Sequence, residues 1–432
     1  MRKHIIITWN MLPFTDNWGG CQRMYYLADS LISAGDSVEI ICAYEGVFVP
    51  ELKHDFSIFA CDIRGCMIRK EDLYYNSFIS EKERNLIDYA GRKRGLIMHI
   101  ATIIAKGANT FFNESSSNKG IKVYIWVFKN LKNLKEIIKK SCCDDVIISG
   151  PPHTLFFLLP KLKKMGVRTI LDYRDPWNTW RAGFPISKRI EGKFLNLADE
   201  IVCTNKNMKG SLRTDFKITP KKIHVIGNGY SKKNWNCIEC SDKSEEDFVI
   251  SYIGSINLRN FVSYRNCKNM IEAFEKFNNK YKDTKLKFVG INDFDNDLLE
   301  KYKKKNVEIK GKVSVDESFR IMEKSDVLMI MHTAEDMSGK YIISAKLYDY
   351  IAANKAVIGI GHDYDLHKEI IEKEDIGVFC RNDTCEIKAA YEKLYEKWKA
   401  GTLKVCCSNK EVYTREFQNR KYVRLLNGEL DA

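Results

Sequence analysis

Short, unbroken apolar runs recur along the chain, and segments with helical spacing separate them. The clearest unit starts with the run VLMIM at 327–331, passes through a polar loop at 332–340 and has helical spacing at 343–353 before a second run, AVIGI, at 356–360. Runs of this length bounded by loops predict buried strands, and the segment between them predicts a helix. In strand–helix–strand units of this kind, ligands bind beyond the carboxyl ends of the strands.

The same alternation fills both halves of the chain and predicts an α/β protein with two doubly wound parallel sheets. At 432 residues the chain is too long for one ordinary core. The polar, aperiodic stretch 231–247 is the expected hinge, so we predict domains at 1–235 and 236–412 and a final helix within 413–432. The expected strands lie at 4–9, 37–43, 145–149, 168–172, 200–204, 222–226, 248–254, 286–290, 307–310, 327–331 and 356–360, with helices at 21–34, 268–280 and 315–324.

The composition and the first residues of the chain indicate in which cellular compartment the protein works. No apolar run approaches the roughly 18 residues that span a bilayer, and the first residues, MRKHIII, have too short an apolar core for a signal peptide. We therefore expect a cytoplasmic protein whose 14 cysteines are free thiols. Cys237 and Cys240 would fit half a zinc site or a redox couple, but no second pair has matching spacing, so we expect no metal site.

The positive charge is concentrated in one segment. The net charge is +13, and residues 91–140 carry eleven Lys or Arg against two acids, which gives +9 in fifty residues. This segment belongs to an insertion at about 74–141 that breaks the alternation, and its basic surface suits anionic lipid headgroups. Within it, the apolar stretch 96–105 is either an interfacial segment or a buried helix. The alternative of nucleic-acid binding lacks any recognisable binding motif.

Candidate chemistry lies where the helix at 343–353 begins. Lys346 and Asp349 are three residues apart and share one helical face. A cation beside a helix N-terminus suits a diphosphate, and a carboxylate one turn later can accept hydrogen bonds from ribose hydroxyls. The alternative is a surface ion pair worth a few tenths of a kcal/mol. Gly19 and Gly20 open an earlier helix, where they either let backbone N–H groups approach a phosphate or form a plain entry turn.

Nine short motifs follow one another along nearly the whole chain. They are WGGCQR at 18–23, SGPPH at 149–153, DYRDPW at 172–177, AD at 198–199, NGY at 228–230, YIGS at 252–255, FVG at 288–290, GKV at 311–313 and KLYDY at 346–350. In this order they resemble glycosyltransferase family 4, which has the GT-B fold of two Rossmann-like domains facing across a cleft. Any one of them is weak evidence, but their shared order is specific. The PPH and RDPW forms resemble a branch associated with bacterial surface polysaccharides.

The resemblance implies transfer of a sugar from a UDP- or GDP-linked donor with retained anomeric configuration, without a metal or other cofactor. The acceptor would be a lipid-linked or other oligosaccharide, and the enzyme would be peripheral on the inner face of the plasma membrane. The final helix would cross back to the N-terminal domain. The implied catalytic residues are Lys346, Arg174 and His153, and the implied donor-binding residues are Gly19, Gly20, Gly254, Ser255, Arg259, Lys268, Tyr341, Lys346, Leu347 and Asp349.

On the donor side the chain departs from the family pattern at two positions. Ser255 stands where the family usually has Arg, so Lys268, or failing that Arg259, would supply the missing charge. Tyr341 replaces the first of two family glutamates, and Asp349 aligns with the second. These changes keep two alternatives open, namely a non-catalytic nucleotide-sugar-binding relative and a sugar-nucleotide epimerase of the same fold.

The acceptor-side motifs also have competing interpretations. Arg174 stands where many relatives have histidine, and it either stabilises charge near the sugar or pairs with Asp175. His153 either faces the ligand or caps a helix, and Trp177 either stacks on a sugar ring or packs in the core.

Overall fold

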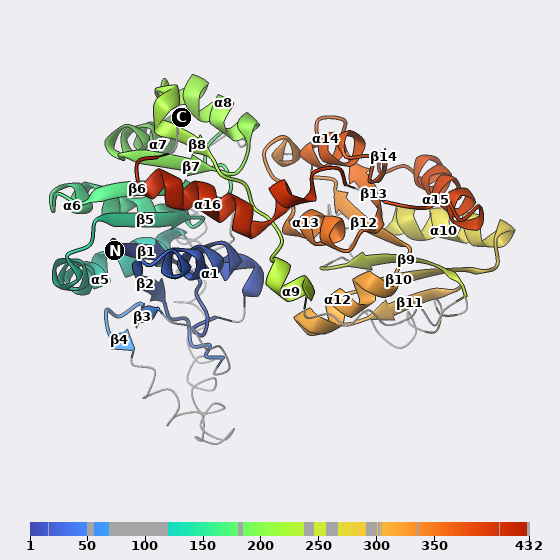
Figure 1. Ribbon diagram of the computed structural model, residues 1–432, viewed down its shortest axis with the longest axis horizontal. Helices are drawn as coiled ribbons and strands as arrows, with labels where there is room; N and C mark the ends of the chain where they lie inside the picture. Colours follow the sequence, from blue (N-terminus) through green and yellow to red (C-terminus); the bar gives the residue numbers. More distant parts are fainter. Residues whose placement is uncertain are drawn as a thin grey trace, which may run out of the picture. The chain divides into compact units, whose positions relative to one another are not determined.

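The computed structural model describes residues 1–15, 17–49, 56–68, 120–179, 185–236, 246–255, 267–290, 300, 303, 305–334, 337–405 and 407–429. It divides into two compact units, Met1–Gly227 with Asn419–Ala432, and Asn228–Gln418 (Figure 1). Arg259, the pair Cys237 and Cys240, and the apolar stretch 96–105 lie outside the described residues.

The first unit is built on an eight-stranded sheet in the order β4-β3-β2-β1-β5-β6-β7-β8. All neighbouring strands are parallel except the edge pair β3 and β4. The strands are β1 (Lys3–Thr8), β2 (Ser37–Ala43), β3 (Ser57–Cys61), β4 (Met67–Ile68), β5 (Asp145–Gly150), β6 (Arg168–Tyr173), β7 (Glu200–Cys203) and β8 (Ile223–Val225).

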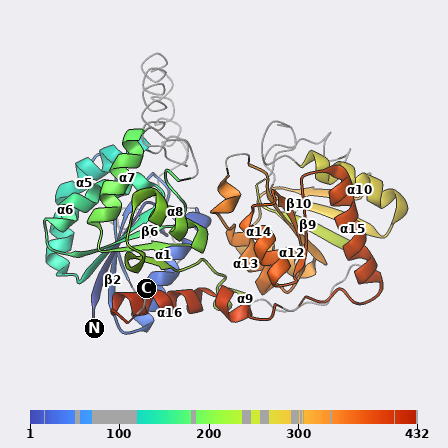
Figure 2. The same ribbon diagram turned by 90° about the horizontal axis from the view of Figure 1, so that it is seen from above.

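Helices cover both faces of this sheet (Figure 2). One face packs on α5, α6, α7 and α8, and the other packs on α1 and the end of α16. Ile5 and Ile7 point to the first core and Ile6 to the second, which explains why the run is continuously apolar. The helices are α1 (Trp18–Ser33), α5 (Gly120–Ser141), η1 (His153–Leu158), α6 (Leu159–Lys163), α7 (Pro185–Leu197), α8 (Lys206–Phe216), η2 (Pro220–Lys222) and α16 (Arg415–Leu426).

The second unit repeats the pattern with a six-stranded parallel sheet in the order β11-β10-β9-β12-β13-β14. Helices α10 and α15 cover one face, and α12, α13 and α14 cover the other. Its strands are β9 (Phe248–Ile253), β10 (Thr284–Val289), β11 (Val307–Lys310), β12 (Val327–His332), β13 (Ala356–Gly361) and β14 (Gly377–Cys380). Its helices are α9 (Lys232–Asn236), α10 (Lys268–Lys280), α12 (Val315–Lys324), η3 (Ser338–Lys340), α13 (Ala345–Ala352), α14 (Leu366–Lys373), α15 (Thr384–Lys399) and η4 (Lys410–Tyr413).

These two sheets confirm the predicted fold class of doubly wound parallel α/β domains. In the described part of the chain, no helix combines the length and the apolar character that crossing a lipid bilayer requires.

The structure places the division between the units at Gly227, eight residues before the position expected from the sequence. The reason is that the polar residues after Gly227 pair with the segment before α16. The Tyr230 N–H donates to the Tyr413 carbonyl (3.0 Å), and the Arg415 N–H donates to the Tyr230 carbonyl (2.8 Å). Trp235 then packs on Phe319 with its ring centre 4.8 Å away. The start of the expected hinge is therefore part of the second unit.

Gly229 makes this pairing possible. A Cβ at position 229 would lie 2.6 Å from both the carbonyl carbon of Thr414 and the carbonyl oxygen of Tyr413. No L side chain fits at such distances from backbone atoms, so the two strands of chain would have to separate.

We therefore predict that Gly229→Ala lowers the free energy of unfolding by about 1–3 kcal/mol, as overpacking in a tight site does. The measurement is urea unfolding followed by circular dichroism. Gly210 in α8 is the matched control, because a Cβ there meets no atom within 4 Å. Gly210→Ala is expected to be neutral or slightly stabilising. An unchanged midpoint for Gly229→Ala would contradict the assigned role.

Candidate functional site

Two glycines end the central strands of the second unit and leave their carboxyl ends without side chains. Gly254 follows β9 with φ +140°, and Gly290 follows β10 with φ +102°. The Gly254 N–H donates to the Val289 carbonyl (2.7 Å), and a Cβ at position 290 would lie 3.0 Å from the Gly254 carbonyl carbon. Backbone conformations of this kind are ordinary for glycine only, and they let a ligand approach the main chain closely.

Lys346 fills the space beside the first of these glycines. A Cβ at position 254 would lie 1.8 Å from Lys346 Nζ, so the ammonium occupies the place where a side chain would stand. The same nitrogen lies 4.9 Å from the centre of the Tyr252 ring, in cation–π geometry. The structure thus brings together two predicted site residues, Gly254 and Lys346, at the carboxyl end of β9.

The first turn of α13 adds to this positive region. Ser344 is the N-cap of α13 but its side chain makes no capping bond, and Lys346 is the second residue of the helix. Because a helix N-terminus carries partial positive charge, a lysine there is unfavourable by a few tenths of a kcal/mol until an anion joins it. Glycine ends, an ammonium and a helix start therefore form an arrangement suited to a phosphate.

Asp349, one turn further along α13, is half-buried and lies near Trp235 and the charge of Arg415. Its Oδ1 lies 3.5 Å from Nε1 of Trp235. Burial raises the pKa of Asp349 to about 6, against the lowering effects of the Arg415 charge and the Trp235 hydrogen bond. The carboxylate is thus ionised at neutral pH. These partners and this burial do not fit the alternative of a solvated surface pair.

A histidine behind α13 fixes the start of that helix. The Ser344 N–H donates to Nε2 of His367, 3.0 Å away, so this nitrogen must be unprotonated. Burial, together with the charge of the neighbouring His332, lowers the pKa of His367 to about 4, against the raising effect of Asp365. At neutral pH His367 is therefore a neutral acceptor that holds the residue two positions before Lys346.

A buried carboxylate supports the same loop. Asp365 accepts a hydrogen bond from the His362 N–H (3.0 Å), and its Oδ1 lies 3.5 Å from Nδ1 of His332. Nε2 of His332 lies 3.0 Å from Oγ of Ser338, at the start of η3. A Cβ on Gly339 would lie 1.5 Å from Asp365 Oδ1, so the loop passes directly over the carboxylate.

Sequence reasoning missed this histidine cluster. The available signal was that three of the eight histidines lie at or after the carboxyl ends of two neighbouring strands: His332 ends β12, and His362 and His367 follow β13.

The other predicted donor-side residues differ in burial, from the core to the exposed surface. Leu347 has its side chain in the core and is 0% exposed, so any contact with a ligand would come from its backbone. Tyr341 is half-buried, and its N–H donates to the Ser338 carbonyl (2.9 Å). Ser255 is exposed and accepts at its carbonyl from the Tyr252 hydroxyl (3.3 Å). Lys268 is exposed at the start of α10 and lies 3.8 Å from Glu272.

In the first unit, the glycine turn is held by its own neighbours. The Gly20 N–H donates to the side chain and to the carbonyl of Asn17 (both 3.1 Å), which caps α1. The structure therefore corrects the expectation that the Gly20 amide is open to a phosphate. A Cβ at position 20 would meet Asn17 at 2.7 Å and Asn10 at 2.8 Å, which explains the glycine by packing. Gly19 is exposed.

Arg174 braces this turn from the end of β6. Its guanidinium donates to the carbonyls of Gly20 and Pro151, and Nε lies 3.5 Å from the carbonyl of Gly150. Burial lowers the pKa of Arg174, and the charge of Asp175 opposes that shift, so Asp175 acts on Arg174 through its charge. Arg174 also joins two loops that follow β1 and β5.

His153 was predicted to face the ligand or to cap a helix, but in the structure it lies in the core. It is 0% exposed and stacks on Trp177 with ring centres 5.4 Å apart, and its Nε2 donates to the Asp175 carbonyl (3.0 Å). A substrate cannot contact it directly, because the aromatic core between η1 and β6 surrounds it. Trp177 is 1% exposed and also belongs to the core rather than stacking on a sugar.

A buried acid beneath these loops was also missed. Glu191 on α7 is fully buried, and its Oε2 accepts from both the backbone N–H (3.1 Å) and the side-chain amide (2.8 Å) of Asn178. Burial raises the pKa of Glu191 to about 7. The available signal was its spacing with Ser187 and Leu195 on the buried side of the helix.

An ion pair in the first unit joins α1 to β6, beside the residues that follow β8. Arg23 is 7% exposed and donates to both carboxylate oxygens of Asp172 (2.8–3.1 Å). It also donates to the carbonyls of Ile226 and Gly227 (both 2.9 Å). Arg23 of the WGGCQR motif is thus committed to holding the chain where the first unit ends.

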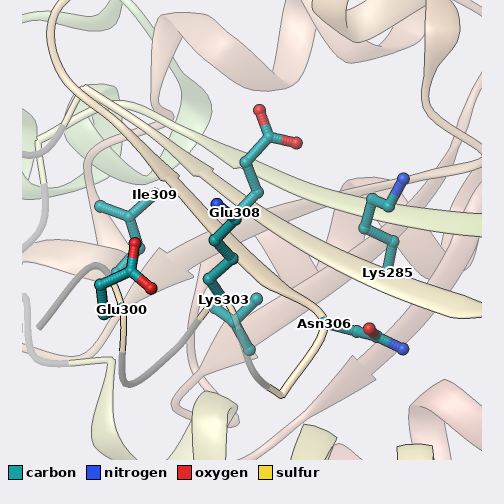
Figure 3. A pocket seen from close by; sticks show the side chains of 7 residues that line it. Lys285, Glu300, Lys303, Asn306, Glu308 and Ile309 are labelled. Carbon is teal, nitrogen blue, oxygen red and sulfur yellow. The ribbon is translucent and has the colours of Figure 1, made fainter.

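Figure 3 shows a cavity of about 460 Å³ elsewhere in the second unit. Lys285, Lys303, Glu300 and Glu308 give it balanced charge, and it lies along the first half of β11, away from the Gly254 turn. Among the residues that the structure describes, no three His, Cys, Asp or Glu side chains gather as metal ligands. The expectation that the reaction needs no metal therefore stays a prediction.

Comparisons with known proteins extend this description. The profile of Glycosyltransferase Family 4 matches residues 102–233. No curated protein sequence matches the chain. Among solved structures, a glycosyltransferase from Rickettsia africae ESF-5 is similar at 14% identity, covering 99% of this chain and 98% of that chain with a TM-score of 0.64.

Two further structures share the fold. Anabaena Alr3699/HepE in complex with UDP is 11% identical, with 99% of this chain and 100% of that chain covered and a TM-score of 0.63. The UDP-GlcNAc 2-epimerase from Methanocaldococcus jannaschii is 12% identical, with 99% of each chain covered and a TM-score of 0.55. At these identities the likeness concerns the fold alone. The family profile thus matches residues 102–233, and the whole chain has the GT-B fold expected from its motifs.

Proposed function

We propose that the protein is a metal-independent glycosyltransferase that moves a sugar from a nucleotide-sugar donor to an oligosaccharide acceptor, with retention. The observation that carries this proposal is the position of Lys346 Nζ beside Gly254, at the carboxyl end of β9 and the start of α13. The family match over residues 102–233 supports a sugar transferase at a coarse level. UDP in the similar Anabaena structure favours a UDP-linked donor, with GDP as the alternative.

The proposed chemistry follows from charge development. As the bond between sugar and diphosphate breaks, negative charge grows on the phosphate oxygens. Lys346 and the first N–H groups of α13 would stabilise that charge without reorganising, because His367 already holds the helix start. Gly254 and Gly290 would let the diphosphate approach the backbone, and Asp349 would accept hydrogen bonds from the ribose.

The proposed acceptor is a lipid-linked sugar of a bacterial surface polysaccharide. Arg174 and the Gly20 turn would shape its binding loops, and His153 and Glu191 would support them from inside the core. The two family glutamates are a tyrosine and an aspartate here, which leaves the identity of the donor sugar open.

An epimerase is the second candidate, because a UDP-GlcNAc 2-epimerase shares the fold. The two functions differ in their need for an acceptor: an epimerase converts a donor alone, whereas a transferase consumes acceptor as it releases nucleoside diphosphate. A non-catalytic relative would bind a donor and release nothing. A thermal-shift screen of UDP-, GDP- and dTDP-sugars identifies the donor, and product analysis with and without acceptor then separates the three functions.

The first prediction concerns Lys346. Lys346→Ala is expected to lower kcat/KM for sugar transfer by about 10²–10³-fold, as loss of one preorganised charge-stabilising group does. The measurement is release of nucleoside diphosphate, with thermal unfolding to check the fold. Lys397→Ala, at an exposed lysine of α15, is the control and should keep full activity. Full activity of Lys346→Ala would refute the role of the ammonium.

The second prediction concerns the pH dependence of nucleotide binding. The pKa of Asp349 is about 6, so its carboxylate is ionised above pH 6 and neutral below it. UDP affinity should therefore fall as the pH drops through 6, and Asp349→Asn should bind UDP about ten- to a hundredfold more weakly at pH 8.

Calorimetry at pH 5 to 8 measures this, and Asp349→Asn is also the control. A phosphate of UDP titrates near pH 6 as well, but the variant lacks only the carboxylate contribution. If wild type and variant show the same affinity at every pH, Asp349 does not bind the ribose.

We also propose that the first unit docks on an anionic membrane surface through α5. Tyr124, Ile125 and Phe128 are exposed on this helix, with Phe128 73% exposed, and Lys129 and Lys132 lie exposed beside them. Val127, Leu134 and Ile138 of the same helix are buried. An apolar strip flanked by lysines is typical of helices that lie in a membrane interface.

The third prediction tests this surface. The protein should float with vesicles that contain anionic lipid, and binding should weaken with salt. Phe128→Asp should reduce flotation severalfold, whereas Val315→Asp, at an exposed apolar residue of α12, should not. Flotation that is equal for neutral and anionic vesicles, or absent from both, would exclude this surface as a membrane anchor.

A further inference from the structure

A second feature of the first unit lies at the opposite end of its sheet from the loops described above. A cavity of about 460 Å³ opens between the end of α5 and the turn that joins α6 to β6. These helices lie side by side (Figure 2). The cavity adjoins the starts of β5 and β6, whereas Gly20 and Arg174 follow the carboxyl ends of β1 and β6. Its lining residues are Lys135, Ile138, Lys139, Cys142, Cys143, Lys161, Lys164, Met165 and Val167.

Four lysines and no carboxylate line this cavity. Lys135 and Lys139 come from α5, and Lys161 and Lys164 come from α6 and its end. None of these four forms an ion pair within the described residues. The neighbouring Lys163, by contrast, binds both carboxylate oxygens of Asp199 at 2.7 Å. The cavity therefore gathers lysines that form no ion pair with an acid of the described residues. The carboxylates nearest to its lining are those of Asp145, Glu39 and Asp144, and burial together with these charges raises the pKa of the Cys143 thiol to about 11.

The acids nearest in sequence are already engaged. Asp144 accepts a hydrogen bond from the Lys3 N–H (2.8 Å). Asp145 is fully buried and pairs with Arg2 (3.0 Å) and Arg168 (3.1 Å). Glu136 is exposed on α5 but does not line the cavity.

Helix dipoles explain only part of this lysine cluster. Both α5 and α6 end at the cavity, and basic residues in a last turn offset the partial negative charge of a helix C-terminus. Two such ends carry about −1 elementary charge together, against four ammonium groups. The four ammonium groups thus exceed what the helix ends offset, and they lie above a floor in which Ile138 and Cys143 are buried and Met165 and Val167 are half-buried. An apolar floor lowers the local dielectric and strengthens attraction for an anion.

We propose that this cavity binds a multiply charged phosphate group. Its volume lies in the range of small-molecule sites, and lysines are effective point-charge ligands for phosphate. The same chemistry could come from a free diphosphate, such as that of a nucleotide, or from the headgroup of an anionic phospholipid. The inference does not depend on the donor site of the second unit, because the two sites share no residue.

Chemical labelling of lysines tests the site directly on the full chain. The protein is acetylated briefly with and without inorganic pyrophosphate, and mass spectrometry gives the rate at each lysine. Pyrophosphate should slow acetylation severalfold at Lys135, Lys139, Lys161 and Lys164. Lys129, an exposed lysine of α5 outside the cavity, is the internal control and should react at an unchanged rate.

A second arm uses vesicles of phosphatidylglycerol in place of pyrophosphate. Protection of the four cavity lysines by vesicles alone identifies a lipid headgroup, and protection by pyrophosphate identifies a free phosphate. Lys397, an exposed lysine of α15, is the control in this arm, because Lys129 belongs to the proposed membrane surface of α5. Either result supports the proposal if the control lysine of that arm stays reactive. Unprotected cavity lysines in both arms, or equal protection of the control lysine, would overturn it.

Calorimetry supplies an independent check. Lys139→Glu with Lys164→Glu should weaken pyrophosphate binding at this site by about tenfold or more, which corresponds to at least 1.4 kcal/mol. The matched variant Lys129→Glu should leave binding unchanged. Binding at the donor site would appear as a second event that Lys346→Ala removes and the cavity variants keep, so failure of one proposal is separable from failure of the other.

Discussion

The contact between the Lys346 ammonium and the Gly254 backbone is the constraint on which the account of the donor site depends. The ammonium stands where a side chain at position 254 would be, so this position of Lys346 requires a glycine at 254. Gly254 and Gly290 both have positive φ, and neither has a side chain that would enter the same space. Because the start of α13 adds partial positive charge, this arrangement suits an anion.

Two layers hold that arrangement in place. His367 accepts the Ser344 N–H and fixes where α13 begins, and Asp365 and His332 support the loop that precedes it. On the other side of the helix, Asp349 meets Trp235, from the segment that pairs with the chain before α16. The positions of Lys346 and Asp349 therefore depend on residues far away in the sequence.

Local pattern predicted most of the fold because the central strands, such as β1, β5 and β9, are apolar on both faces. The strands β3, β4 and β14 were not predicted. The bounds of α10 and α12 were predicted to the residue, and Ser314 caps the second of these helices. The site was harder to predict. Arg174 binds the carbonyls of Gly20 and Pro151, and His153 is enclosed by aromatic rings, and neither environment leaves a trace in local spacing. The unit boundary shifted for the same reason, since the Tyr230 pairing with Thr414 joins distant segments.

The most direct test of the donor site is a crystal structure of the protein with UDP. The account predicts that an oxygen of the diphosphate lies within hydrogen-bond distance of Lys346 Nζ, with the phosphates against the Gly254 turn and the start of α13. UDP bound with its phosphates out of reach of Lys346 would contradict the account.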